Sequence, residues 1–421
     1  MRYYKLQELC TNIIDCPHST PEWKNEGLRV VRNFNLKNGI LDFTDGYFVD
    51  EATYIERTRR AIPEEGDIII SREAPMGVVG IIPKGLKCCL GQRLVLLKVN
   101  REKCDPQYLL NALMSEFVQT QFRRADATGS IVSNLCIPDL KEIIIPVVEN
   151  GQREIAHLLE VISRKLALNN AINDNLAQQL RLLYDYWFTQ FDFPDENGKP
   201  YRSSGGQMVW NDDAKQDIPI DWSYAKISDA IEGIRTGLNP RDNFKLGNGT
   251  IKYITVKNLR SDGILDFSGC DTIDEAARAI VHRRSDVCPG DILFASIAPL
   301  GRCHLVQEPP QDWDINESVF SIRCNKATVT PEYLYMHLQG EAFVKKSTAC
   351  STGSVFKGIR INTLLDSRML LPSMQVVEKF SKQTKPLFSL QHKLNKEIQA
   401  LTQIRDWLLP MLMNGQATIS D

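Results

Sequence analysis

Gly39-Ile40-Leu41-Asp42-Phe43 returns unchanged 224 positions later as Gly263-Ile264-Leu265-Asp266-Phe267. The same offset relates three further groups: Gly66-Asp67-Ile68 with Gly290-Asp291-Ile292, Ala74-Pro75 and Gly77 with Ala298-Pro299 and Gly301, and Thr128-Gly129-Ser130 with Thr352-Gly353-Ser354. One five-residue identity could arise by chance, but four groups at one offset indicate an internal duplication. The period is far too long for a solenoid, so we expect each copy to fold as its own unit.

The composition is that of an ordinary globular protein. The chain has 421 residues, of which 43% are hydrophobic and 24% charged, and this length fits two large domains with connectors. Its longest apolar runs, such as Ile143 to Ile145, are far too short to cross a bilayer. The first residues lack the apolar core of a signal peptide. We therefore expect a cytoplasmic protein without a membrane partner.

Cysteine usage and net charge narrow the possible functions. The eleven cysteines are scattered and include no Cys-x-x-Cys pair, so we expect reduced, packed thiols and no metal site. The formal net charge of −2 argues mildly against strong unaided DNA binding, because such proteins usually carry a basic excess. Local basic clusters or partner subunits would have to supply much of the attraction to phosphates.

Each copy divides into a mixed part and a helical part. The mixed parts, residues 1–150 and 223–373, contain short β-type runs such as Asp67 to Ile70 and Leu94 to Val99, followed by helical stretches at Pro106 to Phe122 and Pro331 to Lys346. Two α+β domains are therefore predicted. The helical parts are residues 151–190 and 374–415, with a Pro-, Gly- and Ser-containing connector at 191–222 and a tail at 416–421.

Both helical parts carry a heptad pattern, which is typical of a coiled-coil seam. Its period of 3.5 residues relates two sets of positions, namely Ile155, Leu159, Ile162, Leu166, Asn169, Asn173, Leu176, Leu180, Leu183 and Trp187, and Val376, Phe380, Gln383, Leu387, Leu390, Leu394, Glu397, Leu401, Ile404, Leu408 and Met411. We expect the two helices to pack on each other in antiparallel fashion, giving the chain a pseudo-two-fold symmetry. The alternative is that each helix docks on its own globular domain. Pro386 should kink or restart the second helix, because proline lacks the N–H donor.

The ends of these helices carry motifs that identify a family. Leu183 to Phe188 leads into Phe191-Asp192-Phe193-Pro194, and Gly198-Lys199-Pro200-Tyr201, Ser203 to Gly206, Ile218-Pro219 and Trp222 follow. At the far end stand Arg405 to Pro410 and Leu412 to Gly415. With the repeated Gly-Asp-Ile, Ala-Pro-x-Gly and Thr-Gly-Ser groups, this order resembles the DNA-specificity (S) subunit of type I restriction–modification systems. The resemblance covers nearly the whole chain.

The resemblance implies a non-catalytic DNA reader in a prokaryotic cytoplasm. Each mixed domain would recognise one half of a bipartite, asymmetric site in double-stranded DNA, and the helices would set the gap between the halves. Two adenine-methyltransferase (M) subunits would dock on the helices, and restriction/motor (R) subunits would complete the restriction form. The chain itself would bind no cofactor, since S-adenosylmethionine, ATP and Mg would belong to the partner subunits.

Paired basic residues are candidate phosphate contacts. Arg59-Arg60 and Arg283-Arg284 occupy equivalent positions upstream of the Gly-Asp-Ile groups, where they could clamp phosphates or belong to solvated turns. Arg123-Arg124 and Lys345-Lys346 end helices before the Thr-Gly-Ser groups, a location that the helix dipole alone also favours. Single long donors that could reach guanine edges are Arg72, Arg93 and Arg302.

The Thr-Gly-Ser loops are candidate base-reading segments, because small hydroxyl residues beside glycine allow close approach to a groove. The alternative is a plain β-turn before a strand. The candidate contacts differ between the copies: Thr128, Ser130, Ser133 and Asn134 in the first, and Thr352, Ser354, Lys357 and Arg360 in the second. This difference suits two half-sites of different sequence.

Aromatic residues at the helix ends are candidates for a subunit interface. They are Tyr184, Tyr186, Trp187, Phe188 and Trp407. The cluster at the end of the first helix could equally cap the core of the helix pair. A subunit interface needs these rings to be exposed on the isolated chain, whereas a cap of the helix core needs them to be buried.

Catalytic motifs are weak or missing in the sequence. It contains no Gly-x-x-x-x-Gly-Lys-Ser/Thr loop for an ATP motor, and Asn239-Pro240-Arg241-Asp242 departs from an amino-methyltransferase motif. Asp195 and Asp213 with Lys215 imitate a nuclease pattern, but they lie in the connector, away from the rigid strands that a metal site needs. The rivals of DNA recognition are therefore a coiled-coil scaffold that joins two ligand-binding domains without nucleic acid, and a stand-alone nuclease.

Overall fold

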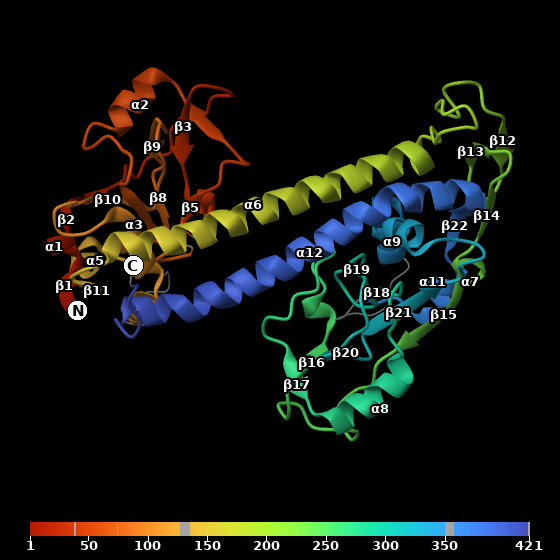
Figure 1. Cartoon of the computed structure of the whole chain (residues 1–421). Coiled ribbons are helices and arrows are strands. Elements are labelled where there is room, and N and C mark those ends of the chain that lie inside the picture. Colours follow the sequence, from red (N-terminus) through yellow and green to blue (C-terminus); the bar gives the residue numbers. More distant parts are fainter. Residues whose placement is uncertain (38, 74, 127–134, 350–357, 420–421) are drawn as a thin grey trace. The chain divides into compact units, whose positions relative to one another are not determined.

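The computed structural model describes residues 1–37, 39–73, 75–126, 135–349 and 358–419. Its contacts divide the chain into two compact units, Met1–Leu168 with Ile398–Asp421, and Asn169–Glu397. The boundary falls inside both long helices, α6 (Gln152–Tyr184) and α12 (Met374–Met413) (Figure 1). Each unit therefore combines one globular domain with a segment of each helix.

The described part of the first unit contains four sheets. In the largest, the strand order is β2 (Cys10–Asp15), β10 (Leu94–Val99), β7 (Ile68–Ser71), β8 (Val79–Ile81), all antiparallel. In the second, β3 (Leu28–Val31) lies between β6 (Tyr47–Val49) and β9 (Cys88–Leu90) and is parallel to β9. Two-stranded pairs are formed by β1 (Arg2–Lys5) with β11 (Ile144–Val147), and by β4 (Leu36–Lys37) with β5 (Ile40–Leu41).

Short helices cover these sheets. They are α1 (Leu6–Leu9), α2 (Glu51–Arg57), α3 (Pro106–Met114), α4 (Glu116–Asp126) and α5 (Ile137–Glu142), with a 3₁₀ turn at Asn33–Asn35. The single helical stretch predicted for Pro106 to Phe122 is two helices. Ser115 has an extended backbone, and its hydroxyl donates to the carbonyl of Ala112, 2.6 Å away, which ends α3.

The globular domain of the second unit repeats this architecture. Its strand orders are β15-β21-β18-β19, β17-β16-β20 and β14-β22, and each matches a sheet of the first unit strand for strand. The strands are β14 (Ser223–Lys226), β15 (Ile231–Thr236), β16 (Ile251–Ile254), β17 (Asp271–Ile273), β18 (Ile292–Ala295), β19 (Cys303–Leu305), β20 (Trp313–Ile315), β21 (Val319–Cys324) and β22 (Arg368–Leu371). The internal duplication seen in the sequence is thus present in the topology.

The helices of the second domain follow the same order. They are α7 (Ile227–Ala230), α8 (Glu275–Ser285), α9 (Pro331–Gln339), α10 (Glu341–Ala349) and α11 (Ile361–Asp366), with a 3₁₀ turn at Val256–Asn258. The stretch predicted as one helix from Pro331 to Lys346 also divides in two. Here Gly340 lies between α9 and α10, at the position that Ser115 holds in the first unit.

The repeated Gly-Ile-Leu-Asp-Phe segment forms the same turn in both domains. Gly39 and Gly263 have φ of +86° and +82°, a left-handed conformation that favours glycine. The side-chain amide of Asn35 donates to the carbonyl of Asp42 at 2.7 Å, and that of Asn258 donates to the carbonyl of Asp266 at 2.9 Å. The segment is a turn fastened to the preceding 3₁₀ turn, which explains its unchanged sequence.

The repeated Gly-Asp-Ile group fastens neighbouring strands through its aspartate. Asp67 forms an ion pair with Lys98 of β10 at 2.7 Å, and Asp291 forms one with Arg323 of β21 at 2.8 Å. Both carboxylates also accept a backbone N–H three residues earlier in the chain, from Glu64 and Cys288 respectively. The group is therefore a structural anchor of each domain.

The heptad pattern of the first helix describes its buried face well. Nine of its ten seam residues are buried, including the polar Asn169 and Asn173, and Leu183 is half-buried. The helix is α-helical to Tyr184 and ends in a π-helical turn over Asp185–Thr189. The prediction of one long helix here is confirmed.

The seam proposed for the second helix is partly wrong. Gln383, Leu390 and Ile404 are exposed, whereas the buried face includes Val377, Phe380, Ser381, Thr384 and Phe388. The reason is that α12 also packs on its own domain: Ser381 donates to Glu332 of α9 at 2.7 Å, and the ring of Phe388 lies 5.5 Å from that of Tyr335. A single heptad pattern describes one buried face, so it cannot describe a helix that packs both on the other long helix and on its own domain.

Proline does not restart this helix. α12 is continuous over 40 residues, and Pro386 lies within it on an exposed face. Proline leaves the backbone carbonyl of the preceding turn without its N–H donor. Because this face of the helix is exposed, water can donate a hydrogen bond to that carbonyl instead. The predicted restart at Pro386 is therefore wrong.

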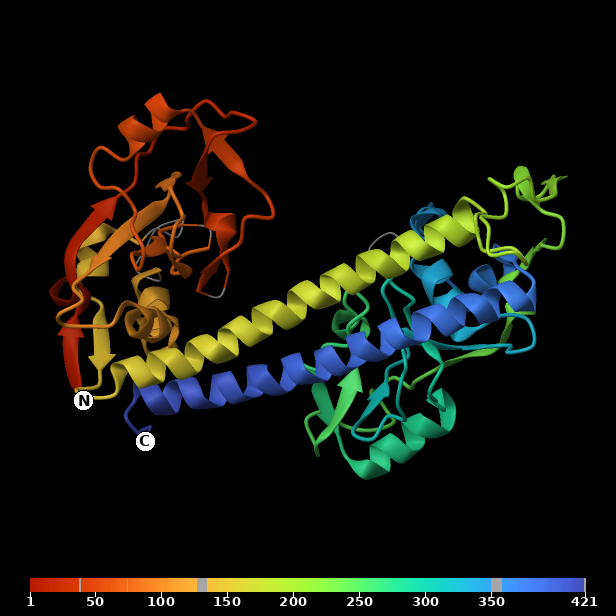
Figure 2. The same ribbon diagram turned by 45° about the horizontal axis from the view of Figure 1, so that its top comes forward.

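The two long helices contact each other inside each unit. In the second unit they lie alongside each other in both views (Figures 1 and 2). There Asn169 donates to Glu397 at 2.8 Å, and the rings of Trp187 and Phe380 lie 5.7 Å apart. In the first unit, Leu159 of α6 shares a core with Leu412 of α12. Within the second unit, partners further along α6 meet residues earlier in α12, so the contact is antiparallel there.

The connector contains a hairpin that the sequence did not indicate. β12 (Met208–Asn211) pairs with β13 (Gln216–Pro219), and the rings of Phe193, Tyr201 and Trp222 stack beside it. Asp195 accepts backbone N–H groups of Asn197 and Lys199, and Asp213 pairs with Arg368. Both aspartates of the nuclease-like pattern thus have structural partners.

Candidate nucleic-acid interface

The two Thr-Gly-Ser loops return to equivalent places in the two domains. Thr128, Ser130, Ser133, Asn134, Thr352, Ser354 and Lys357 lie outside the described residues. The chain that leaves the first loop is fixed by a backbone hydrogen bond of 3.0 Å from Leu135 to Arg72, just after β7. The chain that leaves the second is fixed by a bond of 2.8 Å from Ile359 to Ser296, just after β18. Equivalent strand ends therefore hold the residues that follow the two candidate base-reading loops.

Arg72 lies at this anchor, but its guanidinium is used within the domain. It forms an ion pair with Asp15 at 2.9 Å and donates to the carbonyl of Leu135 at the same distance. Only 12% of its side chain is exposed. The structure therefore gives Arg72 a role in holding the loop end.

Arg93 and Arg302 lie closer to solvent. Arg93 has a left-handed backbone with φ of +67° and pairs with Glu73, 3.0 Å away, and half of its side chain is exposed. Arg302 is half-buried beside β19. Because Glu73 directly follows Arg72, Arg93 belongs to the surface around the first loop.

The arginine pairs are exposed in both domains. Arg59 and Arg60 follow α2, and Arg283 and Arg284 form the last turn of α8. Arg60 donates to the carbonyl of Asp15, and Arg283 donates to the carbonyl of Ala279, each at 3.3 Å. Within the described part of the chain, neither pair has a carboxylate partner, so all four charges are available to a phosphate backbone.

The basic residues near the loops are exposed, with partners on their own helices. Arg123 contacts Glu116 and Thr120, and Lys345 forms an ion pair with Glu341 at 2.6 Å. Arg124, Lys346 and Arg360 are also exposed. Arg123, Arg124 and Lys346 lie in the last turn of a helix, which fits both interpretations made from the sequence, a favourable helix dipole and a phosphate contact. Arg360 instead precedes the first turn of α11, where the dipole disfavours a cation.

The aromatic candidates separate into core and surface residues. Trp187 and Phe188 are 2% and 4% exposed and pack against Phe380, so their rings are not open to a partner. Tyr184 is half-buried in the same core. Tyr186 and Trp407 are 37% and 60% exposed. Of this set, only Tyr186 and Trp407 present their rings on the surface.

An aromatic and arginine cluster in the first domain escaped the sequence analysis. The guanidinium of Arg32 lies over the rings of Trp23, Phe34 and Tyr47, and that of Arg29 lies over Phe43 and Phe48. The signal that could have revealed it is the density of aromatic residues between positions 23 and 48. This cluster is the richest set of base-compatible groups in that domain.

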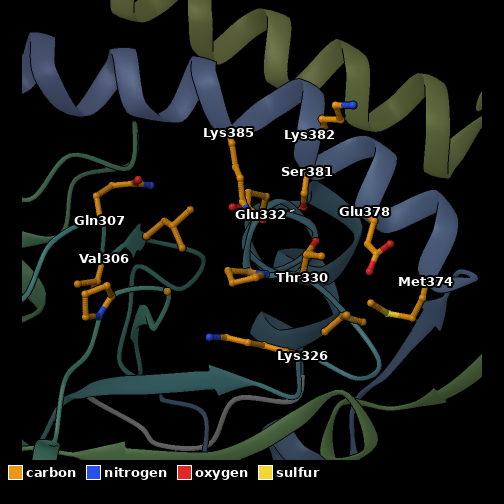
Figure 3. A pocket seen from close by; sticks show the side chains of 15 residues that line it. Val306, Gln307, Lys326, Thr330, Glu332, Met374, Glu378, Ser381, Lys382 and Lys385 are labelled. Carbon is orange, nitrogen blue, oxygen red and sulfur yellow. Dashed lines mark hydrogen bonds between the residues drawn. The ribbon is translucent and has the colours of Figure 1, made fainter.

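Two hollows occur in the second unit. The one in Figure 3, of about 670 Å³, lies between α9 and α12, where the buried carboxylate of Glu332 accepts the hydrogen bond of Ser381. None of the residues proposed from the sequence lines it. A larger one, of about 1010 Å³, is lined by Tyr184, His337, Lys345 and Lys346. Burial lowers the pKa of His337 there to about 4.

The metal-ligating side chains, the helices and the thiols of the described residues bear on other classes of function. Among them no group of three His, Cys, Asp or Glu side chains could hold a metal ion, and no helix is long and apolar enough to cross a membrane. The ten described cysteines are free thiols, and burial raises the pKa of Cys88 to about 12. Exposed guanidinium and aromatic groups remain, which suit nucleic acid.

Comparison with known proteins finds relatives of this chain. Residues 4–178 match the type I restriction modification DNA specificity domain. The type I restriction enzyme MjaIX specificity subunit of Methanocaldococcus jannaschii is 22% identical over 88% of this chain and 85% of its own length. The type I restriction enzyme HindI specificity subunit of Haemophilus influenzae is 19% identical over 86% and 88%.

A solved structure supports the fold along the whole chain. The S subunit of a type I restriction–modification system from M. genitalium superposes with a TM-score of 0.60 at 18% identity, covering 97% of this chain and 94% of that one. The chain is therefore similar, along most of its length, to specificity subunits of type I restriction–modification systems, and it shares the fold of a solved S subunit. The resemblance inferred from the helix-end motifs is confirmed.

Proposed function

We propose that this protein is the DNA sequence-recognition subunit of a type I restriction–modification complex. Each globular domain reads one half of a bipartite, asymmetric DNA site. The paired helices set the distance between the halves as an antiparallel coiled coil with pseudo-two-fold symmetry. They also dock two methyltransferase subunits, and restriction subunits join this assembly in the cytoplasm. The chain catalyses no step itself, and directs adenine methylation or cleavage by its partners.

One observation carries this proposal: equivalent strand ends, after β7 and β18, anchor two loops of different sequence. A constant scaffold with variable loops is how a duplicated protein reads two different half-sites. The antiparallel contact between α6 and α12, seen through Asn169 and Glu397, supports a helical spacer. Exposed Arg59, Arg60, Arg283 and Arg284 supply phosphate contacts that fix each domain on the duplex.

The test is a map of adenine methylation in cells that express this chain with its methyltransferase subunit. The expected result is one bipartite motif with a fixed gap. Charge reversal by Arg59→Glu with Arg60→Glu should reduce methylation at every copy of the motif, because phosphate contacts act regardless of sequence. Lys199→Glu with Arg202→Glu, in the exposed connector, is the matched control and should leave methylation unchanged.

Two other results would contradict the proposal. A short contiguous motif would show that the domains do not read separate half-sites. Absence of any motif, with no binding of duplex DNA by the purified complex, would favour the coiled-coil scaffold. Metal-dependent cleavage by the chain alone that Asp195→Ala abolishes would instead reveal a nuclease.

A further inference from the structure

Arg32 is held in the first domain by three aromatic rings. Its guanidinium carbon lies 4.7 Å from the ring centroid of Tyr47, 5.3 Å from that of Phe34 and 5.4 Å from that of Trp23. The rings support one another, with Trp23 and Tyr47 separated by 4.7 Å. Such cation–π contacts fix the orientation of the guanidinium without an ion pair.

This mode of fixation leaves the hydrogen-bond donors of Arg32 unused. All five N–H groups of a guanidinium lie in its plane, and in the described part of the chain none of those of Arg32 donates to a protein oxygen. Other arginines of the same domain donate to protein oxygens, such as Arg57 to Leu90 and Arg72 to Asp15. Within the described part of the chain, Arg32 has no carboxylate partner. The guanidinium N–H groups of Arg32 are therefore free to donate to a ligand.

The cluster lies near the strand end to which Leu135, the first described residue after the loop, is bonded. Gly91 donates its N–H to the carbonyl of Val31 at 2.7 Å, and a Cβ on Gly91 would lie 3.0 Å from the stem of Arg32. The neighbouring Asn33 donates to the carbonyl of Glu73 at 2.7 Å, and Glu73 pairs with Arg93. Since Glu73 directly follows the loop anchor Arg72, the arginine fork and the loop end belong to one face.

The second domain replaces this cluster with different groups. The matching turns Asn33–Asn35 and Val256–Asn258 put Thr255 at the position of Arg32 and Lys257 at that of Phe34. The matching strands β6 and β17 put Asp271 at the position of Tyr47. The Thr255 hydroxyl is hydrogen-bonded to Asn258 at 3.0 Å. The cluster therefore distinguishes the first domain from the second.

We propose that Arg32 reads a guanine in the first half-site through paired hydrogen bonds to the O6 and N7 atoms of that base. An arginine fork matches these two acceptors, and the aromatic support lowers the entropy lost on binding. Exposed Phe34 contacts the neighbouring base or sugar. This inference rests on the proposed function of the chain and assigns a base-reading residue to it.

The test compares methylation motifs of the full complex with Arg32→Gln and Arg32→Lys. Arg32→Gln should lose the preference for guanine at one position of the first half-site by roughly ten- to hundredfold, whereas Arg32→Lys, whose ammonium can still donate to O6 and N7, should keep part of it. The second half-site and the gap should stay the same. Arg2→Gln, which removes an exposed arginine paired with Glu149, is the matched control and should change nothing. Thermal unfolding of each purified complex verifies that the variants are folded.

The outcomes separate this inference from the function on which it rests. If the wild-type complex has no bipartite motif, the proposed function fails and Arg32 has no half-site to read. If the wild-type motif appears but Arg32→Gln leaves it unchanged, only the inference about Arg32 is wrong. An equal loss of methylation at all sequences, with normal unfolding, would make Arg32 a phosphate contact and would also overturn it.

Discussion

The side-chain amide of Asn169 on α6 donates a hydrogen bond of 2.8 Å to the carboxylate of Glu397 on α12. One turn along α6, the amide of Asn173 donates to Asn395 at 2.5 Å. Both asparagines are buried among apolar seam residues. Polar pairs in such a seam reduce stability but penalise other registers, because a shifted helix would leave them without partners.

Loss of Asn395, the hydrogen-bond partner of Asn173, should destabilise the contact between the two long helices. Asn395→Ala leaves the buried amide of Asn173 without its acceptor, so the free energy of unfolding should fall by about 1–3 kcal/mol. Urea unfolding measures this. Asn175→Ala, on the exposed face, is the control and should change it by less than about 0.5 kcal/mol. Replacing both Asn173 and Asn395 by leucine should restore the free energy of unfolding. A double variant that is less stable than Asn395→Ala would contradict this role of the polar pair.

The Asp291–Arg323 ion pair should contribute more to stability than an exposed pair. Asp291→Ala removes a carboxylate that is only 2% exposed and leaves its buried hydrogen-bond donors without an acceptor, while Arg323 keeps an ion pair with Asp286 at 3.2 Å. Unfolding should therefore become easier by about 1–3 kcal/mol. Asp213→Ala breaks an exposed pair with Arg368 and should cost less than about 1 kcal/mol. Equal losses for the two variants, in urea unfolding, would show that the Gly-Asp-Ile aspartate is not an anchor.

His304 should make the second domain sensitive to acid. Burial lowers the pKa of this imidazole to about 4, from 6.5 in the unfolded chain. Between these values the unfolded chain binds more protons, so stability is complete above about pH 6.5 and is lost as the pH falls towards 4. His304→Gln should reduce the fall in melting temperature between pH 7 and pH 4.5, and His337, whose pKa burial also lowers to about 4, should account for part of the remainder. The exposed His157→Gln serves as control, and an unchanged pH profile for His304→Gln would contradict this assignment.

Exchange of one domain should change one half of the methylation motif. If residues 223–373 are replaced by the corresponding segment of a relative, the first half-site and the gap should remain, because the first domain and both helices are retained. Methylation mapping in cells reports both halves at once. A change in both halves would show that the domains do not read independently.

The two helix-end tryptophans should behave in opposite ways. Trp187→Ala removes a core ring and should lower the free energy of unfolding by about 3–5 kcal/mol. Trp407→Ala removes an exposed ring, so stability should change by less than about 0.5 kcal/mol. The affinity for the proposed methyltransferase subunit should instead fall about tenfold, as measured by calorimetry. Unchanged affinity would remove Trp407 from that interface.

The sequence predicts well those features that local periodicity determines. The heptad steps from Ile155 to Trp187 give the buried face of α6, since that helix presents one stripe. The runs around Ile68 and Leu94 form strands as expected. The repeat predicts the second domain's topology, because Gly39 and Gly263 require the same left-handed turn.

Features that depend on contacts between distant segments could not be predicted. The second seam fails at Gln383 and Leu390 because α12 also packs on α9, which the heptad pattern cannot show. Arg72 has the sequence context of a base contact, yet Asp15, which is 57 positions away, holds its guanidinium. The aromatic support of Arg32 comes from three separate segments. The sequence therefore points to exposed pairs such as Arg59-Arg60, whose contact with DNA stays a prediction, and it does not reveal the cluster.

The fixed return points of the two loops, at Arg72 and Ser296, have a consequence for how such proteins diversify. A segment tied down by main-chain hydrogen bonds can exchange its side chains, or gain and lose residues, without disturbing the strand that holds it. New target sequences can then arise by mutation or recombination in a few short stretches while the partner subunits continue to recognise an unaltered frame.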